Sequence, residues 1–329
     1  MRAAVITRPG GPEVLEIQER PTPEPGHDQV LVRVHASALN RADLLQRRGL
    51  YPAPPGVPAD IPGMEFAGEV VALGPNAREW REGERVHGLV GGGAHAEYLV
   101  AHERAVVRVP HGLAWDAAGA SPEAFITAHD ALLQADARPG DTVLVHAVGS
   151  GVGLAAAQLA RAFGMRCLGT ARSPDKLERA SEHGVDAGLA LVDGDLEPLA
   201  PFVAAHTGGR GVEVALDLVG GPYLAATIGV MAPRGRVMLI GTMGGGRGEI
   251  DFGRLLRGRL TLRGTVLRAR PIEERIAVTR RFGAEVGPFL ARGAVHPVID
   301  TRFALDDLAR AHERLESNAT FGKVVVLMA

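Results

Sequence analysis

Two patterns of apolar and polar positions divide this chain near residue 122. Before that point, short apolar runs alternate with turns rich in Gly and Pro, and several runs alternate apolar and polar residues with a period of two. Such alternation is typical of half-buried strands, so the first part is predicted to be β-rich and barrel-like. The predicted strands are Ala3–Ile6, Val14–Ile17, Val30–His35, Glu69–Leu73, Arg85–Leu89 and Ala96–Val100.

From about Ser121 the pattern changes to apolar runs separated by helix-length segments. Strands that alternate with helices predict right-handed crossovers and a parallel, doubly wound α/β sheet. The predicted strands are Thr142–Ala147, Arg166–Thr170, Ala187–Val192, Val212–Leu218, Arg236–Ile240 and Leu260–Val266. The helices include Pro122–Gln134, Gly151–Phe163 and one that begins at Ser173, with Pro174 in its first turn.

The last part of the chain is too short to fold as a domain, so we expect it to return to the N-terminal unit. It contains a predicted helix, strand, helix and strand at Ile272–Arg292, Val295–Asp300, Ala304–Glu316 and Lys323–Met328. A length of 329 residues also favours two domains. We therefore predict one domain from residues 1–122 and 267–329, and a second from residues 123–266.

Composition excludes several classes of protein. The 36 basic and 38 acidic residues give a net charge of −2, which indicates no polyanionic partner. Cys167 is the one cysteine, so the chain has no internal disulfide and no zinc site that needs two of its own cysteines. No apolar run reaches the length of a membrane span, and the N-terminus lacks the apolar region of a signal peptide. These features predict a soluble, cytoplasmic protein.

A glycine-rich loop is the sharpest local signal. Gly149-Ser150-Gly151-Val152-Gly153 connects an apolar strand to a helix of small residues. Bare glycines and free N–H groups at a helix N-terminus suit a diphosphate, and the third glycine lets the helix approach the strand. Val148 stands where the first glycine of the usual fingerprint would fall, and tight packing alone is the alternative. The surrounding strand–helix alternation favours a dinucleotide.

The end of the second strand of this sheet bears on which dinucleotide binds. A strand that reads the ribose diol ends in Asp or Glu, but no acid occurs here before Asp175. Arg172, Ser173 and Lys176 instead provide donors for a 2′-phosphate. Lys176 is one of only two lysines, although a solvated helix residue near acidic neighbours is the alternative. The pattern favours NADP(H) over NAD(H).

Seven motifs in order resemble the zinc-independent quinone oxidoreductases of the medium-chain dehydrogenase/reductase superfamily. This resemblance implies a GroES-like β-barrel catalytic domain, a Rossmann domain and an active site in a cleft between them. The motifs are ALNRADLLQRRGLYPAPPG (38–56), PGMEFAGEVVALG (62–74), PEAFITAHDALL (122–133), HAVGSGVG (146–153), LDLVGG (216–221), GTMGGG (241–246) and FGKVVV (321–326).

The departures from the zinc-dependent members concern the metal ligands. Those enzymes have Cys at the position of Asn40 and His at the position of Met64, and an amide and a thioether are poor ligands for zinc. The four-cysteine structural zinc lobe is also missing. We therefore expect no metal, and an acceptor that is already electrophilic, such as a quinone or an enone.

The resemblance also implies roles for individual residues. Asn40, Tyr51 and Thr127 are assigned to catalysis; Asn40 and Tyr51 border the acceptor, and the Tyr51 phenol is the candidate donor to a quinone oxygen. Phe125 and Met243 join Tyr51 at the substrate, although Phe125 as a core residue and Tyr51 as a packed lid are the alternatives. Thr127 would bond the nicotinamide side or simply its own helix.

The same resemblance assigns a larger set to NADPH. The diphosphate loop, the end of the fifth strand of the Rossmann sheet and the nicotinamide-ribose segment supply most of them. Leu191 replaces an aromatic residue or His that relatives use near the adenosine. The full set is Asn40, Thr127, Gly149, Ser150, Gly151, Val152, Arg172, Ser173, Lys176, Gly241, Thr242, Met243, Val266, Leu267 and Lys323.

The sequence leaves three functions open. The leading hypothesis is an NADPH-dependent quinone oxidoreductase; the alternatives are a reductase of enone or alkenal double bonds and a non-catalytic, cofactor-binding structural or RNA-associated protein. Residues 254–281 hold nine Arg and two Glu, but few aromatic residues accompany them, so we interpret them as structural. A homodimer or homotetramer is expected, with Leu260–Val266 as a candidate edge strand.

Overall fold

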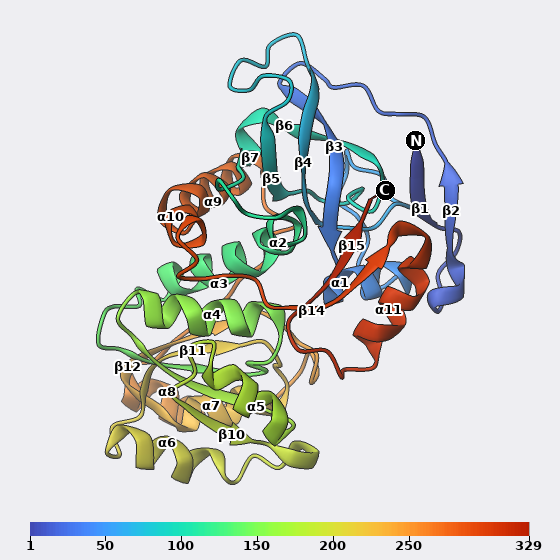
Figure 1. Ribbon diagram of the computed structural model, residues 1–329. Coiled ribbons are helices and arrows are strands. Elements are labelled where there is room, and N and C mark those ends of the chain that lie inside the picture. Colours follow the sequence, from blue (N-terminus) through green and yellow to red (C-terminus); the bar gives the residue numbers. More distant parts are fainter. Residues whose placement is uncertain (329) are drawn as a thin grey trace. The chain divides into compact units, whose positions relative to one another are not determined.

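The computed structural model describes residues 1–328 and divides into two compact units. Unit 1 comprises Met1–Ile126 and the chain from Leu267 onward, and unit 2 comprises Thr127–Val266. Each unit has its own sheet and its own apolar core. Figure 1 shows the elements in sequence colours.

The main sheet of unit 1 is organised around one long strand, β3 (Gln29–Ala38). Its valines at alternate positions are buried, as the period-two pattern predicts. One edge of β3 pairs with β4, and the first half of the other edge pairs with β6. The remaining strands of the N-terminal part are β1 (Arg2–Ile6), β2 (Leu15–Glu19), β4 (Glu65–Leu73), β5 (Arg85–Leu89), β6 (Tyr98–His102) and β7 (Val106–Arg108).

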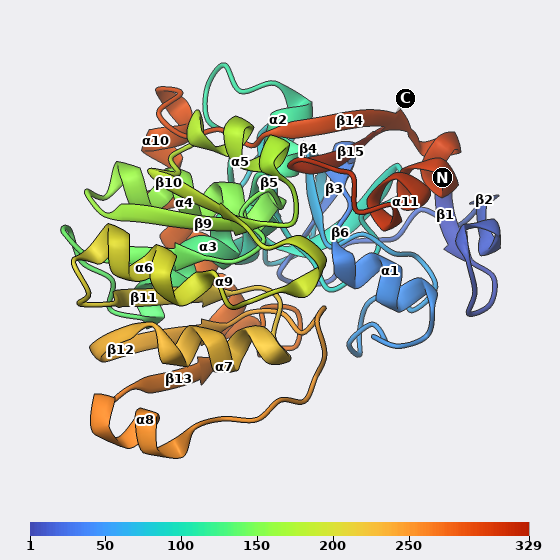
Figure 2. The ribbon, with the colours of Figure 1, turned by 90° about the horizontal axis from the view of Figure 1, so that it is seen from below.

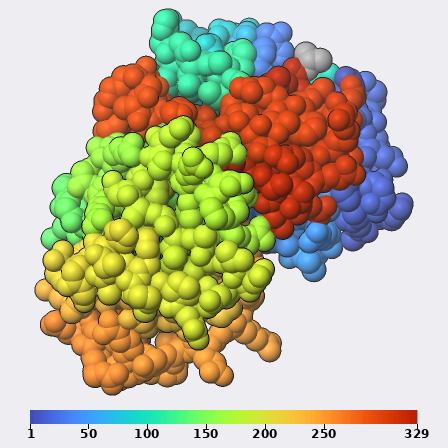
Figure 3. Space-filling model, turned by 60° about the horizontal axis from the view of Figure 1, so that its bottom comes forward, coloured from blue at the N-terminus to red at the C-terminus, as the bar shows by residue number. Residues whose placement is uncertain are grey.

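The C-terminal segment completes this sheet. β15 (Lys323–Leu327) pairs antiparallel with the last residues of β3, on the edge whose first half β6 covers. β14 (Ile299–Ala304) then pairs parallel with β15. Residues from the two ends of the chain consequently lie side by side, in red and blue in Figure 3. Apolar residues of β15 share a core cluster with those of β3 and β4.

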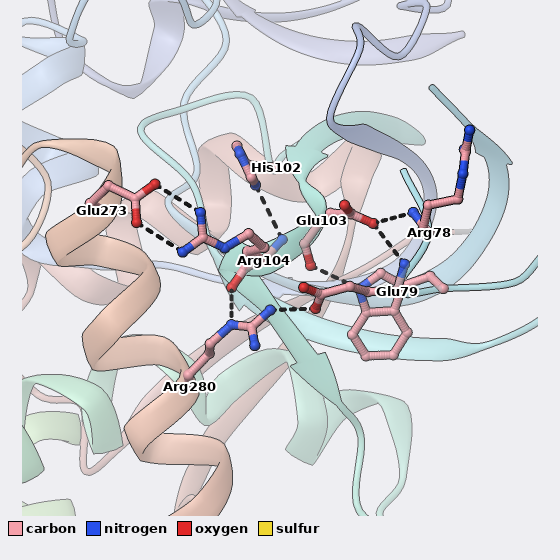
Figure 4. A network of polar contacts seen from close by, with 8 residues as sticks. Arg78, Glu79, His102, Glu103, Arg104, Glu273 and Arg280 are labelled. Atoms are coloured by element: carbon pink, nitrogen blue, oxygen red, sulfur yellow. Dashed lines mark hydrogen bonds and ion pairs between the residues drawn. The ribbon is translucent and has the colours of Figure 1, made fainter. Parts of the chain in front are cut away.

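Arg280 of the Arg-rich stretch lies in α9 (Ile272–Glu285), and Arg104 faces this helix from the turn between β6 and β7. Arg104 donates two parallel hydrogen bonds of 2.9 Å to the Glu273 carboxylate. Arg280 pairs with Glu79 and also donates to the Arg104 carbonyl. Figure 4 shows that these side chains attach the helix to the strand region of the same unit. Internal pairing of this kind supports the structural interpretation.

Unit 2 contains a six-stranded sheet in which all pairings are parallel, with the order β10-β9-β8-β11-β12-β13. This is the predicted Rossmann-type doubly wound sheet, and Figure 2 shows β13 and α8 at one margin of it. The strands are β8 (Thr142–Val145), β9 (Arg166–Ala171), β10 (Ala187–Ala190), β11 (Val212–Asp217), β12 (Met231–Leu239) and β13 (Thr261–Gly264). Its helices are α4 (Gly151–Ala162), α5 (Pro174–Ser181), α6 (Leu199–Thr207), α7 (Pro222–Gly229) and α8 (Phe252–Gly258).

Three predicted elements of the C-terminal part differ from the structure. The helix predicted over 272–292 is interrupted after Glu285, because Pro288 lacks the N–H that a continuous helix requires. The strand predicted at 295–300 instead begins at Ile299, since Pro297 cannot donate to a ladder. The helix predicted over 304–316 begins with a 3₁₀ turn, Leu305–Asp307, before the α-helix starts at Leu308.

The helices of unit 1 are α1 (Arg41–Arg47), α2 (Trp115–Ala120), α9, α10 (Gly287–Ala291) and α11 (Leu308–Glu316). The helix α3 (Pro122–Gln134) contains the point in the chain where unit 1 ends and unit 2 begins.

No helix within residues 1–328 is both long enough and apolar enough to cross a bilayer.

Candidate active site

The strand order of unit 2 reverses between β8 and β11, which are neighbours. From β8 the chain proceeds outward through β9 and β10, and from β11 it proceeds the other way. In open α/β sheets, ligands bind at the carboxyl ends of the strands at such a reversal. His146 and Asp217, both buried, stand at the ends of these two strands.

The predicted glycine-rich loop links β8 to α4 at this position. Ser150 is the N-cap of α4, and its hydroxyl oxygen accepts a 3.1 Å hydrogen bond from the Gly153 amide. A Cβ on Gly153 would lie 2.7 Å from the carbonyl oxygens of Ala147 and Val148. Gly153 is thus required for close approach of helix and loop, as predicted. The packing role and the dinucleotide role are compatible, because the close approach places the helix N-terminus at the strand end.

His146 is held in one tautomer behind this loop. The Thr227 hydroxyl donates its only proton to the Tyr223 carbonyl at 2.7 Å, so it must accept from His146 Nε2, 2.8 Å away. His146 Nδ1 then accepts from the Thr170 hydroxyl, also at 2.8 Å. Burial lowers the pKa of His146 to about 4, which keeps the ring neutral. Neutral His146 therefore fastens the ends of β8 and β9 to α7.

Two further glycine motifs meet at the ends of β11 and β12. Asp217 Oδ1 accepts hydrogen bonds of 2.8 Å from the amides of Val219 and Gly220, which turns the chain sharply after β11. A Cβ on Gly220 would lie 3.0 Å from the Gly241 carbonyl oxygen. Gly220 also has a φ of +68°, which favours glycine. The LDLVGG and GTMGGG motifs thus pack backbone to backbone beside the candidate cofactor loop.

The candidate phosphate-binding residues follow β9 directly. Arg172 is exposed, Ser173 is the N-cap of α5, and Pro174 opens the helix as predicted. The Ser173 side chain makes no capping hydrogen bond. The Arg172 guanidinium acts on Tyr223, where burial raises the pKa of the phenol and the cation opposes that rise. Arg172 and Tyr223 therefore lie near each other at the carboxyl ends of the strands. Tyr223 is not among the site residues that the sequence predicts.

In unit 1 the structure joins two of the predicted site residues directly. The Lys323 ammonium donates to the Leu39 carbonyl at 2.9 Å, to Asn40 Oδ1 at 2.6 Å and to Glu65 Oε1 at 2.6 Å. The Asn40 amide nitrogen donates to Glu65 Oε1 at 3.0 Å and to the Ala38 carbonyl at 3.3 Å. The three N–H bonds of the ammonium and both N–H bonds of the amide are thus used within unit 1. Contact of Lys323 with a cofactor stays a prediction.

Glu65 also anchors α3. Its second carboxylate oxygen accepts a 2.8 Å hydrogen bond from the Glu123 amide in the first turn of that helix. A carboxylate at a helix N-terminus is favoured by the helix dipole. Phe125 and Thr127 follow in the same helix, the first fully buried and the second nearly so. Glu65 thereby fixes both Asn40 and the start of the helix that carries Thr127.

A zinc ion does not fit this part of unit 1. Asn40 and Met64 stand where zinc-dependent members of the superfamily have ligands, and Asn40 Oδ1 already accepts from a buried ammonium. A second, divalent cation beside Lys323 would be repelled. Within residues 1–328, no group of three or more His, Cys, Asp or Glu side chains has an arrangement that could hold a metal.

Tyr51 lies in the segment after α1 and is half-buried. Its carbonyl accepts from Arg268, whose guanidinium carbon is 5.1 Å from the centre of the Tyr51 ring. Burial raises the pKa of the Tyr51 phenol, while Arg268 opposes the rise. The remaining predicted contacts vary in exposure: Met243 and Val266 are 59% and 49% exposed, and Leu267 is buried.

Sequence reasoning missed four side chains that shape these sites. Glu65 and His146 lie within quoted motifs, Tyr223 lies two residues after one, and Arg268 lies in the Arg-rich stretch. Each depends on partners far away in the sequence. A buried charge in an apolar strand, as in MEFAGEVV, was the one available signal for Glu65.

Comparison with known proteins agrees with this geometry. Residues 26–111 match the family model described as the alcohol dehydrogenase GroES-like domain, and residues 151–283 match the one described as zinc-binding dehydrogenase. The quinone oxidoreductase of Pseudomonas aeruginosa is 35% identical over 97% of each chain. The Escherichia coli quinone oxidoreductase complexed with NADPH has a TM-score of 0.88 at 26% identity, covering 99% of this chain and all of that one. The mycobacterial protein Rv1454c complexed with NADPH also has a TM-score of 0.88, at 31% identity and 99% coverage of both chains.

These matches extend over essentially the whole of both chains, and they combine the GroES-like and Rossmann parts in the same order. The chain belongs to the quinone oxidoreductases of the medium-chain dehydrogenase/reductase superfamily.

Proposed function

We propose that this protein is an NADPH-dependent quinone oxidoreductase that transfers hydride to a quinone without zinc. The observation that carries the proposal is the β8–α4 loop, where Gly153 lets the helix N-terminus meet the strand end at the sheet reversal. The whole chain is also similar over its full length to quinone oxidoreductases, one of which was solved with NADPH, and this similarity supports the same function. The location of the acceptor between the units, and a cytoplasmic location of the protein, stay predictions.

The residues present fit NADPH. Gly149, Ser150, Gly151 and Val152 would lie along the diphosphate at the start of α4. Arg172 and Lys176 would meet the 2′-phosphate, and Ser173 has a hydroxyl that the helix cap does not use. The remaining predicted contacts are Asn40, Thr127, Gly241, Thr242, Met243, Val266, Leu267 and Lys323. Bound there, NADPH supplies a hydride to an electrophilic acceptor.

The part of the chain around the acceptor must orient it and stabilise negative charge on its oxygen. Asn40 is fixed by Lys323 and Glu65, and Tyr51 is the candidate hydrogen-bond donor. Such a site works mainly by orientation and by a prearranged polar environment. Phe125 is fully buried, so its predicted stacking on the acceptor would need a rearrangement.

Steady-state oxidation of NADPH tests this function. We expect rapid turnover with a naphthoquinone and slow turnover with an alkenal. A strong preference for the alkenal would instead identify a double-bond reductase, and NADPH binding without turnover would identify a non-catalytic protein. Replacing Arg172 and Lys176 together by Ala should weaken NADPH binding far more than NADH binding; equal loss for both cofactors would contradict the 2′-phosphate assignment.

We further propose that two copies of the chain pair through the β13 edge of unit 2. Every residue of β13 is exposed, among them Leu262 at 37%. Phe252 and Leu256 of the preceding helix α8 are 69% and 74% exposed. An open parallel edge flanked by apolar side chains favours association with a like edge. A small-molecule quinone remains the expected substrate.

A further inference from the structure

Arg268 is a buried arginine at the point where the chain returns to unit 1. Its Nε donates to the Gly91 carbonyl at 2.7 Å, and one terminal nitrogen donates to Gln46 Oε1 at 2.6 Å. The other terminal nitrogen donates to the Tyr51 carbonyl at 3.3 Å. One guanidinium therefore connects α1, the Tyr51 segment and the segment that follows β5.

Apart from α1, the connected segments have little regular structure of their own. Gln46 continues the network by donating to the Ala59 carbonyl at 3.0 Å. A Cβ on Gly91 would meet the Pro54 ring at 2.7 Å, so residues after Tyr51 pack directly onto this glycine. Without Arg268, the Tyr51 carbonyl, the Gln46 side chain and the Gly91 carbonyl would lose the donor that they share.

The positive charge of Arg268 also affects the acidity of the Tyr51 phenol. The guanidinium carbon lies 5.1 Å from the ring centre, within the range of a cation–π contact. Arg268 lowers the pKa of Tyr51, whereas burial and the Glu123 carboxylate raise it. The Asp43 and Glu123 carboxyls also act on Arg268. A neutral hydrogen-bond donor could hold the same carbonyls but would not favour the phenolate.

We propose that Arg268 is a positioning residue for Tyr51, holding its segment in place and placing a cation against the phenol so that the hydroxyl can give up its proton to the acceptor. This inference rests on the proposed function.

The proton and electron balance is simple. Reduction of a quinone to a hydroquinone requires two electrons and two protons. The hydride supplied by NADPH carries both electrons and one proton. The second proton leaves Tyr51 as its O–H bond breaks and a new O–H bond forms on the substrate. The Tyr51 phenolate is then reprotonated from solvent. Until that happens, the positive charge of Arg268 stabilises the phenolate.

Titration of the tyrosines tests the coupling without any turnover. The chain has three tyrosines, so ¹³Cζ-tyrosine labelling gives three signals, and loss of one in Tyr51→Phe identifies Tyr51. In Arg268→Gln the Tyr51 signal should titrate at higher pH than in the unaltered protein. Arg275→Gln is the control, since Arg275 is a partly buried arginine elsewhere in unit 1. An unchanged Tyr51 titration in Arg268→Gln overturns the inference.

Kinetics with NADPH and a naphthoquinone provide the second readout. We expect kcat to fall about a hundredfold in Tyr51→Phe and about tenfold in Arg268→Gln. The double variant should be no slower than Tyr51→Phe, because Arg268 acts through the phenol. Arg268→Lys, which keeps the charge, should recover most of the loss and covers the case in which the Gln variant folds poorly. If the fold-loss of kcat in the double variant equalled the product of the losses in the two single variants, the inference would be contradicted.

The two proposals fail in different ways. Absence of quinone reduction by the unaltered protein would refute the proposed function, while the tyrosine titration would still decide whether Arg268 acts on Tyr51.

Discussion

At the scale of residues, the most consequential feature is a buried ammonium–carboxylate pair. Lys323 and Glu65 are 5% and 0% exposed in their side chains, and together they hold Asn40. Removing two charges from water is costly unless their hydrogen bonds are satisfied, and here both groups have several partners. Zinc-dependent members of the superfamily have metal ligands at the corresponding sequence positions. In this chain the Lys323 ammonium instead fixes the orientation of the Asn40 side-chain amide. The pair thus favours orientation over Lewis-acid chemistry.

Three buried histidines predict how stability depends on pH. Burial lowers the pKa of His87, His95 and His146 to about 4, 3 and 4. Since the unfolded chain binds these protons near pH 6.5, the free energy of unfolding is highest above that pH. It should decrease as the pH falls from 6.5 toward 4, by about 2 kcal/mol per histidine at pH 5. Urea unfolding at pH 7 and pH 5 measures the change.

A variant separates this histidine effect from general acid sensitivity. His146→Gln should reduce the loss of stability between pH 7 and pH 5, while His111→Gln, at an exposed position, should leave it unaltered. Equal stability of the unaltered protein at both pH values would show that the buried histidines do not control this range.

At the scale of elements, the glycine-rich turn illustrates what local sequence can specify. Gly153→Ala would place a methyl group 2.7 Å from backbone atoms of Ala147 and Val148, which cannot give way as a flexible side chain can. We expect a loss of about 1–3 kcal/mol in the free energy of unfolding and weaker NADPH binding. Thermal unfolding and a fluorescence titration with NADPH measure the two effects.

The matched control is Gly229→Ala in α7, where an added Cβ meets nothing within 4 Å. Alanine is the better helix former there, so this variant should be as stable as the unaltered protein or more stable. Similar losses at both positions would show that close approach at Gly153 is not the cause.

Elements with strong local signals were predictable, and those that depend on distant partners were not. The bounds of α3 were predicted without error, and those of α4 differed by one residue at its C-terminus. α1 was missed, because its sequence was interpreted as a motif and its Asn40–Asp43 capping box was overlooked. In the site, Gly153 was assigned correctly from local packing logic. The partners of Asn40 were not, because Lys323 reaches it from 283 residues away.

At the scale of the whole molecule, the chain closes unit 1 with its own C-terminus but leaves an edge of unit 2 open. β15 covers the second half of the β3 edge, so that the sheet of unit 1 has no long unpaired strand there. β13, by contrast, pairs on one side only, with β12. Unpaired strand edges are normally protected by charge, shortness or a partner.

The open edge predicts the oligomeric state. With a chain mass of 34.5 kDa, light scattering after gel filtration should report twice that mass for a dimer or four times for a tetramer. Replacing Leu256 and Leu262 together by Glu should yield the monomer, because charges at these exposed apolar positions oppose pairing along β13. Leu50→Glu is the control, since Leu50 is 70% exposed but belongs to unit 1. A monomeric unaltered protein, or a dimer that persists in the Leu256/Leu262 variant, would exclude the β13 edge as the contact.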